Sequence, residues 1–480
     1  MNKHQKAIEK AAEFVETKRD NAQKSPWQLA YHITTPANWM NDPNGFSTFN
    51  GKYHLFYQFH PYSPEWGPMH WGHVTSKDLV HWEEQPIALA PSEAYDVDGC
   101  FSGSAIEKDG MLYLMYTGNV WTGPDHDKDL KQVQCIAVSE DGIHFEKYEG
   151  NPVISEVPAG LDIHPYHFRD PKVWQEGNTY YCVLGSRTND QQGQVLLYQS
   201  ADLLEWEFVS VLARGEDGFS FMWECPDLFE LDGKDVLLFS PQGVKPRGDY
   251  FKNLHQAGTL VGDWDRTSHT FTHDDFTMMD YGFDYYAPQS TLSPDGRRIT
   301  IAWMAMWESQ MPEQEHDWAG AMTLPREVWL DAENQVRSYP VRELEALRGE
   351  MQTGDLKPYI GELQVEFDLK KTAIAEMLLR VGENGEKTIL RYDAITEKLE
   401  LNRYNSGVGP GGIRRCHVPL RDGKLTLNIF MDRSSIEVFA NRGEKSMTAR
   451  IYPAAESTGF DVKVSAESTI SSVLYWPFHS

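Results

Sequence analysis

An eight-residue pattern recurs three times in the first half of the chain at nearly equal intervals. Each copy reads Ser-x-Asp, then three variable residues, then an aromatic residue and Glu; the copies are Ser76–Glu83, Ser139–Glu146 and Ser200–Glu207. Their first residues lie 63 and 61 residues apart. Strand-like runs and turn residues surround them, and repetition at this period in such a chain is typical of a radially repeated all-β unit. We therefore predict a β-propeller.

Blade positions follow from a second, independent spacing. Asp42, Ser102, Asp170, Glu224 and Ala287 are separated by 60, 68, 54 and 63 residues, and an apolar strand-like run follows each of them. These intervals match the repeat length, so we expect five blades. Equivalent places on blades arranged around an axis converge on one central funnel. Carboxylates far apart in the sequence then become neighbours.

The charge of the chain limits its partners. The 480 residues include 44 basic and 71 acidic side chains, a formal net charge of −27. Nucleic acids and anionic membranes are bound by basic patches, so we expect neither as a partner and a small molecule as the substrate. No run of the sequence reaches the roughly 20 apolar residues that a membrane-spanning helix requires.

Cysteine usage and the first residues bear on the compartment. The cysteines are odd in number, scattered and mostly within apolar runs, which predicts reduced structural thiols rather than a disulfide framework or a zinc site. Residues 1–23 contain no apolar core of a signal peptide and are predicted to form a surface helix. A cytoplasmic protein is the expectation, although the sequence leaves open an export signal removed before residue 1.

The texture of the chain changes after the propeller. A proline-led segment resembles a short helix, and the alternating strands that follow, such as 363–367 and 425–430, predict an antiparallel β-sandwich with one wet face per sheet. The predicted fold is thus all-β, a five-bladed propeller followed by a C-terminal sandwich. The predicted domains are an N-terminal helical segment (1–28), the propeller (29–338), a linker helix (339–350) and the sandwich (351–480).

Asp42 lies in Asn41-Asp42-Pro43-Asn44-Gly45, a turn-forming stretch. Pro43 and Gly45 limit the backbone, and the two asparagines offer local hydrogen bonds. Such a turn holds a carboxylate rigidly among donors, which favours the ionised form that a nucleophile needs. A plain turn aspartate is the alternative.

Two other carboxylates are predicted to have different environments. Glu224 follows Met222 and Trp223, and apolar surroundings would raise its pKa, as a general acid requires. Asp170 follows Arg169, which would keep it ionised. A buried Glu–Arg pair and a structural ion pair are the alternatives. Because all three carboxylates fall at corresponding blade positions, we predict an active site with Asp42, Asp170 and Glu224 as its catalytic residues.

Aromatic and amide side chains near these positions suit a carbohydrate. Aromatic faces cover the apolar patches of sugars, and amides and hydroxyls bind their hydroxyl groups. The predicted substrate-binding residues are Asn41, Gln58, Trp66, Phe101, Ser102, Arg169, Tyr286 and Trp303.

At these residues the sequence resembles glycoside hydrolase family 32. The resemblance runs through nearly the whole chain and rests on segments 39–45, 56–58, 71–73, 101–104, 168–172, 223–227, 286–289 and 432–439. It implies a metal-free and cofactor-free hydrolysis of β-fructofuranosyl bonds with retention of configuration. Carried over to this chain, Asp42 is the nucleophile, Glu224 the acid/base, and Asp170 with Arg169 holds fructose hydroxyls. Retention requires carboxyls about 5 to 5.5 Å apart.

Other readings stay open from the sequence. A fructosyltransferase shares the covalent intermediate, an inverting arabinan-type hydrolase shares the propeller, and a non-catalytic sugar-binding propeller shares the fold. A phosphorylated sugar needs local positive charge, for which Arg187 and the segment 245–247 are candidates. The acidic segment 307–318 would favour a neutral sugar instead. The oligomeric state is also open, including a homodimer through the sandwich.

Overall fold

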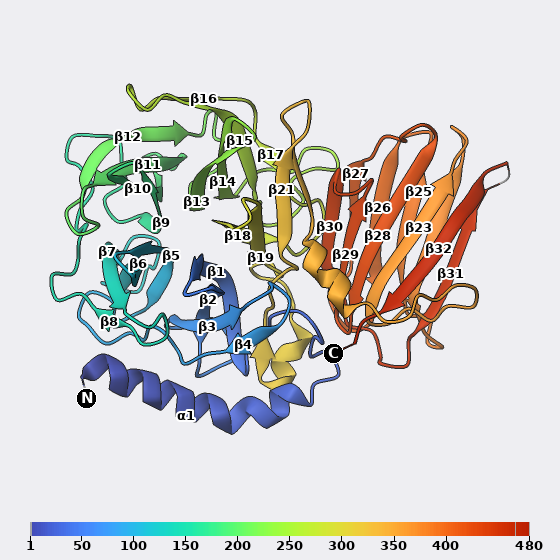
Figure 1. Ribbon diagram of the computed structural model, residues 1–480, viewed down its shortest axis with the longest axis horizontal. Helices are drawn as coiled ribbons and strands as arrows, with labels where there is room; N and C mark the ends of the chain where they lie inside the picture. The colour runs from blue at the N-terminus through green and yellow to red at the C-terminus, as the bar shows by residue number, and fades with distance from the viewer. Residues whose placement is uncertain (1, 466, 480) are drawn as a thin grey trace.

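A propeller of five sheets is followed by a sandwich of two sheets in the computed structural model, which describes residues 2–465 and 467–479 (Figure 1). The predicted fold class is confirmed. The helix α1 (Lys3–Gln23) runs along the outside of the propeller, with Asn2 capping its first turn. Arg19 of α1 forms a bidentate ion pair with Glu84 at 2.8 and 2.9 Å, which fixes the helix against the first sheet.

Each blade is an antiparallel meander. The first sheet contains β1 (Asn38–Phe49), β2 (Lys52–His60), β3 (His70–Ser76) and β4 (Trp82–Glu84), and the second β5 (Cys100–Lys108), β6 (Met111–Trp121), β7 (Leu130–Ser139) and β8 (Glu146–Lys147). The third contains β9 (Phe168–Glu176), β10 (Thr179–Arg187), β11 (Gly193–Ser200) and β12 (Glu207–Arg214). The fourth contains β13 (Met222–Leu231), β14 (Lys234–Gln242), β15 (Gly258–Trp264) and β16 (Phe271–His273), with β17 (Thr277–Met278) beside β15. The fifth contains β18 (Tyr286–Leu292), β19 (Arg298–Trp303), β21 (Arg326–Leu330) and β22 (Val336–Pro340).

The ring closes through its innermost strands. The first strand of each sheet contacts the first strand of the next, and β18 of the fifth sheet contacts β1 of the first. After the 3-10 helix η1 (Pro312–His316), the short strand β20 (Trp318–Ala319) pairs with β1 in parallel. This pairing ties the segment that follows β19 to the first blade.

The repeated Ser-x-Asp pattern forms the turn before the outermost strand of each of the first three blades. In the first copy, the Asp78 carboxylate accepts backbone hydrogen bonds from Val80 at 3.0 Å and His81 at 2.8 Å. The following Trp82 packs on the blade and donates its indole N–H to the Leu79 carbonyl at 3.0 Å. An aspartate that satisfies turn amides is a local reason for the repeat.

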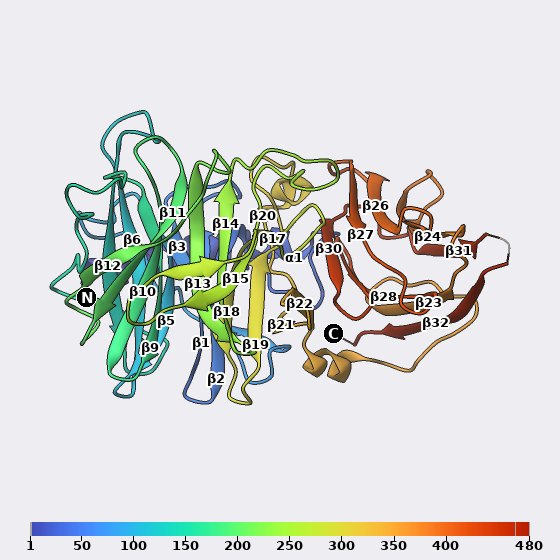
Figure 2. The ribbon, with the colours of Figure 1, turned by 90° about the horizontal axis from the view of Figure 1, so that it is seen from above.

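A 3-10 helix, η2 (Arg342–Leu347), leads from the propeller into the sandwich. One sheet has β23 (Gly361–Asp368), β28 (Lys424–Asp432), β29 (Ser435–Ala440), β30 (Lys445–Arg450) and β32 (Thr469–Pro477). The other has β24 (Ile374–Val381), β25 (Lys387–Asp393), β26 (Lys398–Asn405), β27 (Ile413–His417) and β31 (Gly459–Val464). Figure 2 shows the two sheets as separate layers, and alternate residues of their strands fill the core between them.

Buried charges join the two domains. His32, just before the propeller, bonds Asp432 at 2.8 Å and Glu437 at 3.0 Å. Arg326 of the fifth blade bonds Glu437 at 2.5 Å and Asp280 at 3.0 Å. All five side chains are fully buried. The motif at 432–439 therefore lies at the domain interface and not in a catalytic cluster.

All five cysteines are buried and free, as predicted. Within residues 2–465 and 467–479, no helix has both the length and the apolar character needed to cross a membrane. The same residues contain no cluster of three or more His, Cys, Asp or Glu side chains arranged to hold a metal ion.

Candidate active site

The innermost strands begin around a cavity of roughly 370 Å³ at one end of the propeller axis. Asp42 comes from β1, Ser102 from β5, Asp170 from β9 and Glu224 from β13, each near the start of its strand. The topology thus brings together the three carboxylates that the sequence singled out.

Bulges aim these side chains at the axis. The pairing of each innermost strand with its neighbour skips one or two residues near the strand's start, in all five blades. Asp170, Cys225 and Ala287 have positive φ angles of 65°, 49° and 50°, and a proline follows each of them. A bulge bends the strand and redirects its side chains, and it often occurs next to an active site.

The bulges also correct the predicted blade register. Residues before the shared proline are equivalent, so Asp42, Asp170, Cys225 and Ala287 correspond to one another. Glu224 lies one residue earlier, at the position of Asn41, Arg169 and Tyr286 in the other blades. The acidic residues therefore occupy two adjacent rings around the funnel and not a single one.

Asp42 is held by three side chains. Its Oδ2 accepts hydrogen bonds from the Ser102 hydroxyl at 2.9 Å and the Cys225 thiol at 3.4 Å. Its Oδ1 accepts from the Asn41 amide at 3.1 Å, and the Trp39 indole N–H fixes that amide by donating to Asn41 Oδ1 at 2.8 Å. The carboxylate is therefore fixed in orientation, but only Asn41 of the predicted turn contributes, because Asn44 donates to the Pro43 carbonyl and the other two donors come from other blades.

Asp170 is bound by the next blade. Its Oδ2 accepts a hydrogen bond from the Cys225 backbone N–H at 2.9 Å, and the Cys225 thiol lies 3.6 Å from the same oxygen. The Cys225 thiol thus lies within hydrogen-bonding distance of both Asp42 and Asp170.

Arg169 pairs with Glu224 rather than with its sequence neighbour. Its Nη2 lies 2.6 Å and its Nε 3.0 Å from Glu224 Oε1. The other carboxylate oxygen of Glu224 accepts from the Tyr286 hydroxyl at 2.6 Å and from the Gln242 amide at 3.0 Å. Consecutive residues of a strand point in different directions, so Arg169 and Asp170 bind different groups of the fourth blade, Arg169 the Glu224 carboxylate and Asp170 the Cys225 backbone N–H.

The pKa shifts of the three carboxyls run opposite to the predicted ones. Burial, with the charge of Glu224 second, raises the pKa of Asp42 to about 6 and that of Asp170 to about 7. Burial also opposes ionisation of Glu224, but the charge of Arg169 and the hydrogen bonds of Tyr286 and Arg169 outweigh it and lower the pKa of Glu224. The prediction of an apolar environment for Glu224 was wrong because Arg169, Tyr286 and Gln242 surround its carboxylate, which is the buried Glu–Arg pair given as the alternative.

Most of the predicted binding residues line the cavity, and two do not. Tyr286 is fully buried and reaches the site through its hydroxyl on Glu224. Trp303 is also fully buried, packed on the Trp39 and Trp307 rings at centroid distances of 5.8 and 5.0 Å, so it cannot contact a sugar directly. Those on the cavity wall are Asn41, Gln58, Trp66, Phe101, Ser102 and Arg169.

Sequence reasoning missed much of the cavity wall. Most of these residues come from loops or from strands other than the innermost, and no motif marks them. Trp121 and His126, for instance, stack with their ring centroids 3.9 Å apart. The missed lining residues are Met69, Trp121, His126, Leu130, Gln132, His167, Gln242, Leu254 and His255.

The predicted basic candidates do not line the cavity. Arg187 is buried and paired with Asp127 at 3.1 Å. Lys245 and Arg247 are exposed on a loop outside the cavity wall. Of the acidic segment at 307–318, Glu308 lines the cavity, whereas the buried Glu313 pairs with Arg450 at 3.0 Å.

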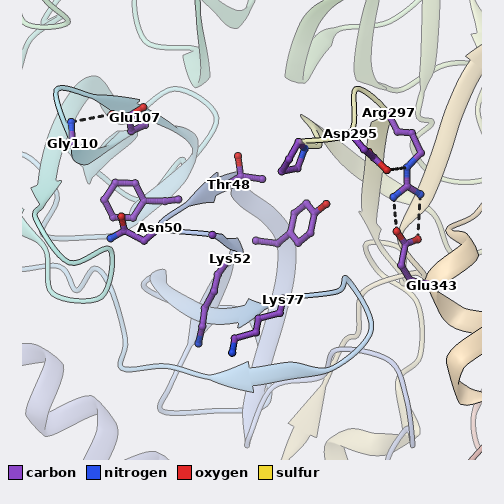
Figure 3. A pocket seen from close by; sticks show the side chains of 13 residues that line it. Thr48, Asn50, Lys52, Lys77, Glu107, Gly110, Asp295, Arg297 and Glu343 are labelled. Carbon is purple, nitrogen blue, oxygen red and sulfur yellow. Dashed lines mark hydrogen bonds and ion pairs between the residues drawn. The ribbon is translucent and has the colours of Figure 1, made fainter.

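A second hollow, of roughly 520 Å³, lies at the far end of β1, where that strand ends at Thr48 and Phe49 (Figure 3). Its Arg297 is bound by Asp295 and Glu343, and its Lys52 pairs with Glu83 at 2.9 Å. These carboxylates are thus already neutralised by cations. The hollow lacks the buried, closely coupled carboxylates of the first cavity, which is therefore the candidate active site.

The fold and the site together define a propeller-type glycoside hydrolase. The model of the glycosyl hydrolases family 32 N-terminal domain matches residues 32–340, and that of the glycosyl hydrolases family 32 C terminal matches residues 337–477. The chain belongs to glycosyl hydrolases family 32.

Similar proteins cover nearly the whole chain. A sucrose-6-phosphate hydrolase of Escherichia coli is 44% identical, over 89% of this chain and 89% of its own length. A raffinose invertase of Escherichia coli is 43% identical, over 93% of both chains. Among solved structures, a mutant beta-fructofuranosidase of Bombyx mori in complex with sucrose has a TM-score of 0.86 and 38% identity, and covers 98% of this chain and 97% of its own.

Proposed function

We propose that this enzyme hydrolyses terminal β-D-fructofuranosides by double displacement, with Asp42 as the nucleophile and Glu224 as the acid/base. The observation that carries the proposal is the convergence of both carboxylates on one sugar-sized cavity, Asp42 fixed by three donors and Glu224 placed beside an arginine. The names of the similar proteins support fructosides as the substrate class.

In the first step, Asp42 attacks C2 of the fructosyl unit while Glu224 donates its proton to the departing oxygen. The C2–O bond breaks and the leaving sugar departs with that proton. Water then attacks C2, Glu224 takes the water proton, and Asp42 is released. Asp170, bound by the Cys225 backbone N–H, and Arg169 hold fructose hydroxyls. Two displacements at C2 give retention.

This cycle requires Glu224 to be protonated, although Arg169 favours its ionised form. A fructosyl unit whose hydroxyls take over Arg169 would weaken that pair and let Glu224 hold a proton. Asp42, whose pKa is about 6, is then the carboxyl that must lose one. Because kcat/KM reports the free enzyme, in which the pKa of Asp42 lies above that of Glu224, we expect kcat/KM to fall as the pH rises above about 6.

The cavity wall favours neutral sugars over sugar phosphates. Among the described residues that line it, Arg169 is the one lysine or arginine, and Glu224 already neutralises it. Glu308 adds a negative charge. A phosphate would need a cation that this wall lacks. We propose sucrose and short fructo-oligosaccharides as the preferred substrates, with sucrose 6-phosphate weaker.

The test compares kcat/KM for sucrose, sucrose 6-phosphate and the trisaccharide 1-kestose, with Asp42→Asn as the blank. We expect the neutral sugars to be turned over at least as well as the phosphorylated one. A strong preference for sucrose 6-phosphate that Lys245→Ala or Arg247→Ala abolishes would overturn the substrate proposal. No turnover of any of the three would overturn the catalytic one.

A cytoplasmic location and a homodimer stay predictions. The free thiols of all five cysteines support a reducing compartment. Fractionation of the source cells for the first prediction, and light scattering of the purified protein for the second, test them.

A further inference from the structure

His255 is a cavity-wall residue that the mechanism above leaves unused. It follows β14, the strand next to Glu224's own strand, and it lines the cavity together with Leu254. The Gly243 backbone N–H donates to His255 Nδ1 at 3.3 Å. In a neutral ring whose Nδ1 accepts, the proton lies on Nε2. Burial lowers the pKa of His255, which keeps the ring neutral.

The position of His255 relative to Glu224 suggests which part of a substrate it meets. The His255 ring lies 5.9 Å from the Tyr286 ring, whose hydroxyl bonds Glu224. Asp42 and its partners Asn41 and Ser102 come from the first two blades instead. An acid/base donates to the departing oxygen, so the leaving sugar lies on the Glu224 side of the cavity.

The loop that carries His255 is held by the C-terminal sandwich. Arg414 of β27 donates to Asn253 Oδ1 through Nε at 2.9 Å and through Nη2 at 2.7 Å. Lys398 of β26 pairs with Asp249 at 2.5 Å. Asn253 Nδ2 in turn donates to the Gly282 carbonyl at 3.0 Å. The loop is therefore fixed at two points by a domain none of whose described residues lines the cavity.

The Arg414 contact is itself well supported. Its guanidinium lies 4.3 Å from the centre of the Phe283 ring, and Arg403 lies 3.9 Å from the same ring. Arg403 is also paired with the buried Asp284 at 2.6 Å, two residues before Tyr286. An arginine that stacks and makes a two-pronged hydrogen bond loses little entropy when it holds a partner.

We propose that His255 donates its Nε2–H to a hydroxyl of the leaving sugar, and that Arg414 of the sandwich is a positioning residue that holds its loop. This inference rests on the proposed function, because it assigns a role on the leaving-group side of that same reaction. It gives the C-terminal domain a part in substrate selection.

The experiment compares two fructosides that differ in the leaving group. Sucrose carries a sugar with hydroxyls, and methyl β-D-fructofuranoside carries a methyl group that cannot accept the His255 hydrogen bond. The variants are His255→Ala, His255→Gln, Arg414→Ala and, as a matched sandwich control, Arg421→Ala, whose side chain pairs with Glu444 away from the loop. A thermal melt of each variant checks that it is folded.

We expect His255→Ala to lower kcat/KM for sucrose about tenfold, mainly through KM, because a neutral hydrogen bond has that worth. Turnover of the methyl fructoside should change by less than about twofold, since that substrate never makes the bond. His255→Gln retains an N–H donor and should recover part of the loss. Arg414→Ala should lower the sucrose to methyl fructoside ratio in the same direction by roughly threefold, and Arg421→Ala should leave it unchanged.

Equal losses on both substrates, or no loss with sucrose, would overturn the role of His255. An Arg414→Ala variant that is folded and keeps the wild-type ratio would overturn the positioning role of the sandwich. If the wild-type enzyme turns over neither fructoside, the proposed function itself has failed, which is a separate result from either of these.

Discussion

Arg169 shows why a partner cannot be assigned from adjacency in a sequence. It precedes Asp170, yet its guanidinium bonds Glu224, 55 residues away. The carboxylates themselves were predictable because each stands in a short motif at a repeated spacing. The protonation of these carboxylates could not be predicted, because it depends on which cation and which hydrogen-bond donors the next blade supplies. Tyr286 illustrates this dependence, because its buried ring reaches the site only through the hydroxyl that donates to Glu224.

Tyr286→Phe should raise kcat/KM on the alkaline side of the pH profile, relative to its value at acidic pH. The Tyr286 hydroxyl donates to Glu224 at 2.6 Å and helps to lower the pKa of that carboxyl. Without this hydrogen bond the pKa of Glu224 rises, so the protonated acid persists to higher pH. The measurement is kcat/KM for sucrose from pH 4 to 9.

Tyr285→Phe is the control for this prediction, because the neighbouring Tyr285 does not line the cavity and does not bond Glu224. Its profile should match that of the wild type. A Tyr286→Phe profile with the same alkaline limb as the wild type would show that this hydroxyl does not set the pKa of Glu224.

At the scale of elements, the bulge in each innermost strand directs the side chains of the repeated blades toward the cavity. The repeat and the five blades followed from spacing and turn chemistry. The bulges had a signal too, because a proline follows Asp42, Asp170, Cys225 and Ala287, and Gly103 follows Ser102. An alignment of the blades on those residues would have made Cys225, and not Glu224, the equivalent of Asp42. Loop residues such as His126 carry no such signal, since their position depends on packing between blades.

Gly103→Ala should impair both stability and activity. A Cβ at Gly103 would lie 1.9 Å from the Met115 carbonyl oxygen on the paired strand β6. Forcing the strands apart costs about 1 to 3 kcal/mol and displaces Ser102, which bonds Asp42 at 2.9 Å. We expect a lower urea midpoint and a fall in kcat of at least about tenfold, since a nucleophile misplaced by about 1 Å can lose more than that.

Gly110→Ala is the matched control in the turn of the same hairpin, β5–β6. An added Cβ there meets nothing within 4 Å, although the φ angle of 76° makes alanine strained. Its stability should fall by about 1 kcal/mol and its activity should stay at the wild-type level. The interpretation fails if the two variants lose activity alike.

At the scale of the whole molecule, the interface of propeller and sandwich is a charged network in a buried place. The two domains were predictable from the change in strand pattern after residue 338. The charged network could not be predicted. His32, Arg326 and Glu437 lie far apart in the sequence, and no periodic pattern links them. Buried charges are tolerated when each has partners, and removing one partner is costly.

The network makes domain docking sensitive to alkaline pH. Burial alone would lower the pKa of His32, but its hydrogen bonds to Asp432 and Glu437 outweigh burial and raise the pKa to about 9. The pKa of an unfolded histidine is about 6.5. The resulting stabilisation is therefore complete below about pH 6.5 and is lost as the pH rises through about 9, a difference of about 3 kcal/mol.

His32→Gln removes this titration, so its free energy of unfolding should depend less on pH between 6.5 and 9 than that of the wild type. The variant should be markedly less stable at pH 6, because Asp432 loses its cation and Glu437 keeps only Arg326. The difference in free energy of unfolding between the wild type and His32→Gln should then narrow as the pH rises, because the wild type also loses the charge of His32. Urea unfolding at pH 6, 7, 8 and 9 measures the gap, and other titrating groups cancel because both proteins share them. A gap that stays constant over this range would mean that His32 is not charged in the folded protein.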